Sequence, residues 1–186
     1  MQRALLLAGA CALWAAPAFS QSPPAQSTPP SVGQETAEQQ PAQSTPSTAD
    51  FVKAAAISDL FEIQSSKLAL KKKAAGEKTF AEHMIHDHSM TTAQLKRMVK
   101  SGRVKAELPA KLDDQHQQML DQLRSDNRAS FDKDYDQMQL RGHQQAVAMF
   151  EAYAKNGDNP ALKHWASQTL PKLQDHLAMA EKLSGR

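Results

Sequence analysis

The chain has 186 residues, with 22 basic and 20 acidic side chains and a formal net charge of +2. This near balance argues against nucleic-acid binding, which needs a basic face. With a single cysteine, and with no paired-cysteine, phosphate-loop or nucleophile-elbow motif, neither a disulfide scaffold nor a familiar enzyme class is expected.

Residues 1–20 have the pattern of a cleavable signal peptide. A basic start is followed by an apolar stretch, and the small residues Ala18 and Ser20 precede the expected cleavage point. The apolar stretch is too short for a comfortable membrane span, so we expect no transmembrane span in the mature chain. We predict export to the periplasm, with outer-membrane association left open. The alternative is lipidation of Cys11, although Ala8 stands where a lipidation signal prefers leucine.

Residues 21–49 are built mainly from Gln, Ser, Thr, Pro and Ala, with Val32 as the only large aliphatic residue. Such a segment buries too little apolar surface to offset the entropy lost on folding. We predict a disordered linker. It serves either as a tether that gives reach within the envelope or as a neutral leader.

Residues 50–186 are predicted to form one all-α domain, because good helix formers dominate and no alternating strand pattern occurs. The first long helix is expected over about 50–75, with Asp50 as N-cap and Gly76 beyond its end. The second is expected over about 80–100, opened by a Thr79–Glu82 capping box and closed by Gly102.

A shorter helix is expected over about 110–123. The third long helix is expected over about 131–155, capped by Ser130, and the fourth begins at Pro160, with Pro171 expected to kink or break it. Four amphipathic helices of matched length predict a four-helix bundle. The extra helix suits a crossover of ferritin-like topology, while a simple up-and-down topology stays open.

Each long helix places a metal-capable side chain in or beside its apolar stripe, where charge is usually excluded. These candidate ligands are Glu62, His88, His143 and His176. If they converge, they suit a transition-metal ion, because imidazole and carboxylate groups bind such ions together. Asp87, Asp132 and Asp175 are candidates to orient the histidines from outside.

The competing interpretation needs no cofactor. A histidine near an apolar face is more often a hydrogen-bonded core residue than a ligand, and Tyr135 would join the same residues in a buried hydrogen-bond network. His83 and His86 fit a solvated helix face, although His83 and Asp87 are four residues apart and could together chelate a surface metal.

The chain resembles the bacterial domain of unknown function 4142 family over about residues 50–183. The matching stretches are Phe51-Val52, Glu62 with Lys67-Leu68-Ala69, Phe80-Ala81 with Met84 and Asp87-His88, Phe131-Asp132 with Tyr135, His143 with Phe150, and Leu170-Pro171 with His176-Leu177. The resemblance implies a ferritin-like fold and no particular function. The family is often labelled an outer-membrane protein, yet no barrel-like strand pattern is present.

A ferritin-like fold also raises the expectation of a di-iron centre, which takes Glu-x-x-His from two helices. The positions three residues before the three candidate histidines hold no glutamate but Ile85, Leu140 and Leu173. A di-iron ferroxidase is therefore not expected. We predict a non-catalytic periplasmic module that binds an unknown envelope partner; the alternative is a metal-binding protein, and an enzyme of unknown substrate ranks third.

Overall fold

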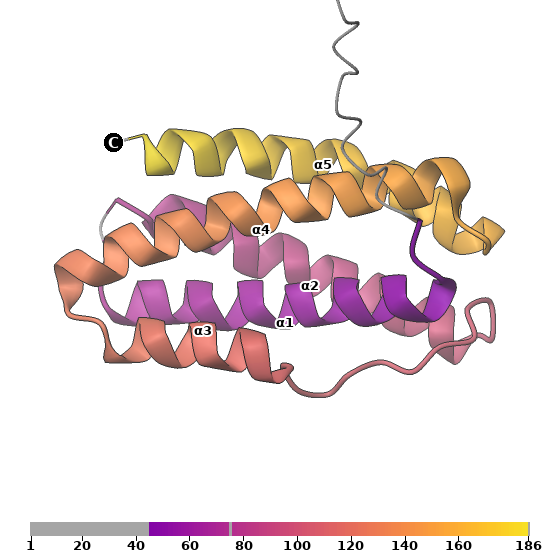
Figure 1. Ribbon diagram of the computed structural model, residues 1–186, viewed down its shortest axis with the longest axis horizontal. Helices are drawn as coiled ribbons and strands as arrows, with labels where there is room; N and C mark the ends of the chain where they lie inside the picture. The colour runs from indigo at the N-terminus through magenta and orange to yellow at the C-terminus, as the bar shows by residue number, and fades with distance from the viewer. Residues whose placement is uncertain (1–44, 75, 186) are drawn as a thin grey trace, which may run out of the picture. The chain divides into compact units, whose positions relative to one another are not determined.

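The computed structural model describes residues 45–74 and 76–185, which form an all-α, ferritin-like four-helix bundle (Figure 1). The helices are α1 (Thr48–Lys71), α2 (Lys78–Lys100), α3 (Asp114–Ser125), α4 (Arg128–Asn156) and α5 (Pro160–Ser184). No strand occurs among these residues, and the short extra helix lies where it was predicted, so the fold class is confirmed. The predicted signal peptide, Cys11 and the linker up to residue 44 lie outside the described residues.

The long helices pair as two antiparallel hairpins, α1 with α2 and α4 with α5 (Figure 1). Residues 101–127 form a crossover that runs back along the bundle and carries α3, so α2 and α4 point the same way. Contacts of α1 with α4 and of α2 with α5 complete the bundle. One long crossover is a ferritin-like feature, and it excludes the up-and-down topology.

The ends of α1 differ from those predicted because other residues fit the cap positions better. Ser47, not Asp50, is the N-cap: its hydroxyl accepts the backbone N–H of Asp50 at 3.2 Å. The helix therefore starts at Thr48, within the predicted linker. Beyond its other end Lys73, three residues before the predicted Gly76, takes the left-handed backbone conformation, with φ 53°.

The predicted Thr79–Glu82 capping box is wrong. Thr79 lies inside α2, whose N-cap, Glu77, makes no side-chain capping bond, and Glu82 forms an ion pair with Lys78 one turn earlier. The predicted end is confirmed, since Gly102 follows the last helical turn with φ +73°. A left-handed residue at this place is a standard helix terminator, and glycine adopts it without strain.

The next two helices also start at unpredicted caps. Asp113 caps α3 by accepting the backbone N–H of His116 at 2.9 Å, so α3 starts at Asp114 and not near residue 110. Asn127, not Ser130, caps α4 through its side-chain oxygen. Several Asp, Asn and Ser residues lie near each start, and the sequence alone does not decide among them.

The last helix starts as predicted. Asn159 caps α5 by accepting the backbone N–H of Leu162 at 3.0 Å, and Pro160 occupies the first turn, where a proline costs no hydrogen bond. Pro171 does not break the helix, which continues to Ser184. No helix in the described part of the chain combines the length and hydropathy needed to span a membrane.

Two apolar clusters fill the bundle. One surrounds aromatic side chains from α1, α4 and α5, and the ring of Phe51 stacks on that of Tyr153 with centroids 4.0 Å apart. The other contains Phe61, Phe80 and Phe131. Burying each such side chain contributes about 1.5–3 kcal/mol to folding.

A buried polar layer lies between these clusters. Along α5, Leu173 belongs to the first cluster and Ala180 to the second, and His176 falls between them. In α4, His143 likewise separates Met138 of the second cluster from the first. Polar groups in this layer are cut off from water on both sides, so their hydrogen bonds decide what the layer can bind.

Candidate metal centre

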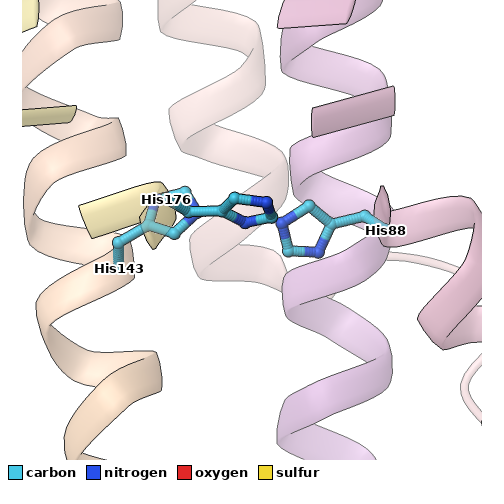
Figure 2. Close-up of side chains that lie close together, drawn as sticks. All are labelled: His88, His143 and His176. Atoms are coloured by element: carbon cyan, nitrogen blue, oxygen red, sulfur yellow. The ribbon is translucent and has the colours of Figure 1, made fainter. Parts of the chain in front are cut away.

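Three imidazoles from three helices meet in the polar layer: His88 on α2, His143 on α4 and His176 on α5 (Figure 2). Each is at most 4 % exposed. The ring centroids are 5.5–5.9 Å apart, and one ring nitrogen of each lies within 4.8 Å of the others. The structure thus brings together three of the four candidate ligands.

The separation of these nitrogens can be compared with that of the ligands in a zinc site. With zinc–nitrogen bonds of about 2.0–2.1 Å, tetrahedral geometry sets ligand nitrogens roughly 3.4 Å apart. The separations of the three nitrogens, all within 4.8 Å of one another, therefore exceed this spacing by at most about 1.4 Å.

His88 is held by a buried carboxylate. Its Nδ1 donates to Asp59 Oδ1 at 2.8 Å, and Asp59 is itself only 5 % exposed. The hydroxyls of Thr91 and Thr92 also donate to this carboxylate, at 2.9 and 2.8 Å. With its acceptor anchored in this way, the imidazole has a fixed orientation and its proton on Nδ1.

His143 is held by its own helix. Its Nδ1 lies 2.8 Å from the backbone carbonyl oxygen of Gln139, one turn earlier in α4. A carbonyl oxygen can only accept, so Nδ1 is the protonated nitrogen. The lone pair of the neutral ring is therefore on Nε2.

His176 is oriented from α2. Its Nε2 donates to Asp87 Oδ2 at 2.9 Å, and Lys172 donates to the same oxygen at 3.1 Å. The lone pair of this ring is therefore on Nδ1. Asp87 thus has the orienting position predicted for it, on a histidine of another helix.

The second nitrogen of each ring has no hydrogen-bond partner among the described residues: Nε2 of His88, Nε2 of His143 and Nδ1 of His176. Buried polar atoms are nearly always satisfied, so three ring nitrogens without partners on adjoining rings call for an explanation. Metal-binding histidines commonly donate one N–H to a carboxylate or carbonyl and bind the ion through the other nitrogen. All three rings have this arrangement.

Burial lowers the pKa of His143 to about 3 and that of His176 to about 4, and the charge of His88 adds to both effects. Both rings are therefore neutral near pH 7, the form that binds metal. Burial also opposes the charge of His88, but the hydrogen bond and charge of Asp59, with Glu62 and Asp87, outweigh it and raise the pKa of His88. The carboxyl groups around His88 therefore favour its protonated form, unlike the surroundings of the other two rings.

Glu62 on α1 lies buried beside the histidines, at 3 % exposed, but it is not part of the group of ring nitrogens that lie within 4.8 Å of one another. Its Oε2 has no hydrogen-bond partner within the described residues. Burial raises the pKa of Glu62 to about 7, against the opposing charge of His88 and a hydrogen bond from Gln139. The predicted set of four is therefore present as three convergent rings and one adjacent carboxyl group.

The raised pKa of Glu62 makes a prediction for the metal-free protein. The folded state keeps the Glu62 proton up to about pH 7, whereas the unfolded chain releases it near pH 4.5. This carboxyl group therefore costs stability as pH rises through that window. In denaturant titrations, Glu62→Gln should gain stability relative to wild type between pH 4.5 and 7.5, by on the order of 3 kcal/mol.

The histidines titrate with the opposite sign, because a lowered pKa makes stability fall as pH drops from 6.5 towards 4. Both proteins contain these histidines, so their effect largely cancels in the stability difference between Glu62→Gln and wild type. A difference between Glu62→Gln and wild type that stays constant across pH would mean that Glu62 is not buried as a carboxyl group.

The other predicted residues lie elsewhere. Asp175 is exposed on α5, because it directly precedes His176 and neighbouring helical side chains point about 100° apart. Asp132 lines a surface cleft near the start of α4. Tyr135 is fully buried, but its hydroxyl hydrogen-bonds the Ser66 hydroxyl at 2.9 Å and its ring stacks on Phe131. The hydrogen bonds of the three rings go instead to Asp59, Asp87 and a backbone carbonyl.

Two partners were missed by the sequence reading. Asp59 gives a signal in retrospect, since aspartate is a weak helix former and here stands mid-helix between Ile57 and Phe61. The backbone carbonyl of Gln139 gives no sequence signal, because whether it accepts a hydrogen bond from His143 depends on the rotamer of that histidine. His83 and His86, by contrast, are exposed, as expected of a solvated face.

Comparison with known proteins adds a family and no activity. The model of the family described as Domain of unknown function (DUF4142) matches residues 33–183, which is most of the chain. No curated protein and no solved structure gave a significant match. The family description names no ligand, so function has to be argued from the site itself.

Proposed function

We propose that this chain, which belongs to the family described as Domain of unknown function (DUF4142), is a non-catalytic metal-binding module of the cell envelope. Its metal ligands are His88, His143 and His176. The observation that carries the proposal is the set of three unsatisfied ring nitrogens, each opposite a nitrogen that donates to a fixed acceptor.

The donor set narrows the class of ion. Imidazole nitrogen suits zinc, copper, nickel and iron, whereas magnesium and calcium prefer oxygen ligands. The described residues contain no cysteine, so no thiolate from them lies beside the three rings. Zinc is the most informative probe, because it has no redox chemistry and accepts histidine and carboxylate together.

The envelope part of the proposal is supported by the sequence of residues 1–20, with its basic start, apolar stretch and small residues before the cleavage point. The non-catalytic part is supported by the lack of a nucleophile motif and by the burial of the three rings. A soluble module in the periplasm with a buried imidazole site suits binding, storage or buffering of a metal ion.

The test is purification of the protein from the periplasmic fraction of cells that express the full chain, followed by mass and elemental analysis. We expect a mature chain that starts at Gln21 and takes up one zinc ion. Replacing all three histidines by alanine should remove the ion, whereas the exposed pair His83→Ala and His86→Ala should retain it. Undiminished metal in the triple variant, with helical content intact, would rule out the site.

A further inference from the structure

A cleft of about 250 Å³ lies between α1, α4 and the start of α3. Ala54, Ile57 and Ser58 line it from α1, and Gly142 and Ala146 line it from α4. Gly142 immediately precedes His143 in the chain. The cleft therefore extends from the protein surface to the helical turn that carries one of the proposed ligands.

Gly142 is an unexpected residue at this place. It lies in the middle of α4, where glycine destabilises a helix relative to alanine. Gly142 does not have a positive φ, so the backbone does not require glycine at this position. A Cβ at Gly142 would contact only Glu62 Oε1, at an ordinary 3.7 Å, so crowding does not require it either.

Because Gly142 has no side chain, the cleft is open towards Glu62. The Cβ position of Gly142 is close to one carboxyl oxygen, and the other, Oε2, is buried with no hydrogen-bond partner in the described part of the chain. Glu62 also interacts electrostatically with His88. The side chain of Glu62 thus lies near both the cleft wall at Gly142 and the imidazole layer.

We propose that this cleft is the route by which a divalent transition-metal ion enters and leaves the three-histidine site, with Glu62 as the first buried ligand that the ion meets. The proposal rests on the proposed function above. Asp50 and Asp113 lie at the cleft and attract cations, partly offset by Lys53. A carboxyl oxygen that has no hydrogen-bond partner among the described residues can replace part of the ion's hydration shell before the imidazoles replace the rest.

A second cleft borders the outer side of the site but is a poorer route. It lies between α2 and α5 and includes Asp87, Thr91 and Lys172. Lys172, which forms an ion pair with Asp87 at 3.1 Å, places a cation in its lining. It leads to the nitrogen of His176 that already donates to Asp87, and not to the free one.

The test is stopped-flow mixing of the metal-free chain with Co²⁺, followed by the visible absorption of the bound ion, for wild type, Gly142→Ala and Gly142→Leu. The leucine variant should bind and release Co²⁺ at least about 10-fold more slowly, with alanine between the two. The equilibrium affinity should stay unchanged, because the three histidines are intact. Ala54→Leu is the matched control: it adds the same side chain at an exposed part of the cleft, two helical turns from Glu62, and should leave both rates unchanged.

The outcomes separate the route from the site. Equal rates in Gly142→Leu and wild type, with equal affinity, would overturn the route and leave the metal site standing. A loss of affinity without slower exchange would also overturn it, because Gly142 would then act on the ligands themselves. A wild-type chain that binds no Co²⁺ or Zn²⁺ would overturn both. Gly142→Ala, which favours the helix, keeps the test valid if leucine impairs folding.

Discussion

Replacing His143 with alanine is expected to lower the affinity for Zn²⁺ by at least about 100-fold, because a structural zinc site gains roughly 3 kcal/mol from each ligand. His143 is the clearest ligand to remove: it is 1 % exposed, its pKa is lowered to about 3, and its Nε2 is unsatisfied among the described residues. Isothermal titration of the metal-free variant measures the effect directly.

Thermal unfolding provides a second reading of the same variant. Zinc at 100 times its dissociation constant should raise the unfolding free energy of wild type by about 2.7 kcal/mol, and this gain should vanish in His143→Ala. His164→Ala is the control, because His164 is exposed on α5 and should keep wild-type affinity. If the two variants bind zinc equally well, His143 is a core residue and not a ligand.

Replacing Asp59 with alanine is expected to have two large effects. The affinity for zinc should fall about 10- to 100-fold, because the orientation of His88 depends on the bond from Nδ1 to Asp59. The metal-free protein should lose about 2–4 kcal/mol of stability, because the buried His88 and the half-buried Thr91 and Thr92 lose their common acceptor. Calorimetry and denaturant unfolding measure the two effects separately.

Asp59→Asn separates the hydrogen bonds from the charge. The amide oxygen of the asparagine still accepts hydrogen bonds, so this variant should regain most of the stability that Asp59→Ala loses. It lacks the negative charge, so it should not stabilise a positive charge on His88. Asp175→Ala is the control on an exposed carboxylate and should change stability by less than about 0.5 kcal/mol. Asp59→Ala matching this control in stability and affinity would remove Asp59 from the site.

The candidate site destabilises the metal-free protein. Each buried, unsatisfied polar atom destabilises a folded protein by about 1–3 kcal/mol, and the three ring nitrogens and Glu62 Oε2 are of this kind within the described residues. Leucine or methionine in their place would pack between the two apolar clusters without that cost. A polar layer of this composition is best explained by a ligand that satisfies it.

The sequence predicts the fold well because the fold depends on a repeated pattern. The helical period recurs over four long segments, and Pro160 and Gly102 are unambiguous start and stop signals. The remaining helix ends were less predictable. Ser47 and Asn127 compete with Asp50 and Ser130 as caps, and only the packed bundle selects between such neighbours.

The candidate site was predictable only in part, for a related reason. Periodicity shows which face of a helix His88 or His143 occupies, but not at what height each ring lies relative to the other helices. Glu62 has the right face, yet it lies beside the three rings and not among them. Which nitrogen of each ring is free depends on Asp59, on Asp87 and on a backbone carbonyl, and these are tertiary and rotamer details.

Anomalous diffraction at the zinc edge, from crystals of the zinc-loaded protein, tests the central claim most directly. The site described above predicts one strong peak in the core, about 2.0–2.1 Å from Nε2 of His88, Nε2 of His143 and Nδ1 of His176. No peak in the core, with zinc only at surface groups such as His83 or His86, would contradict it.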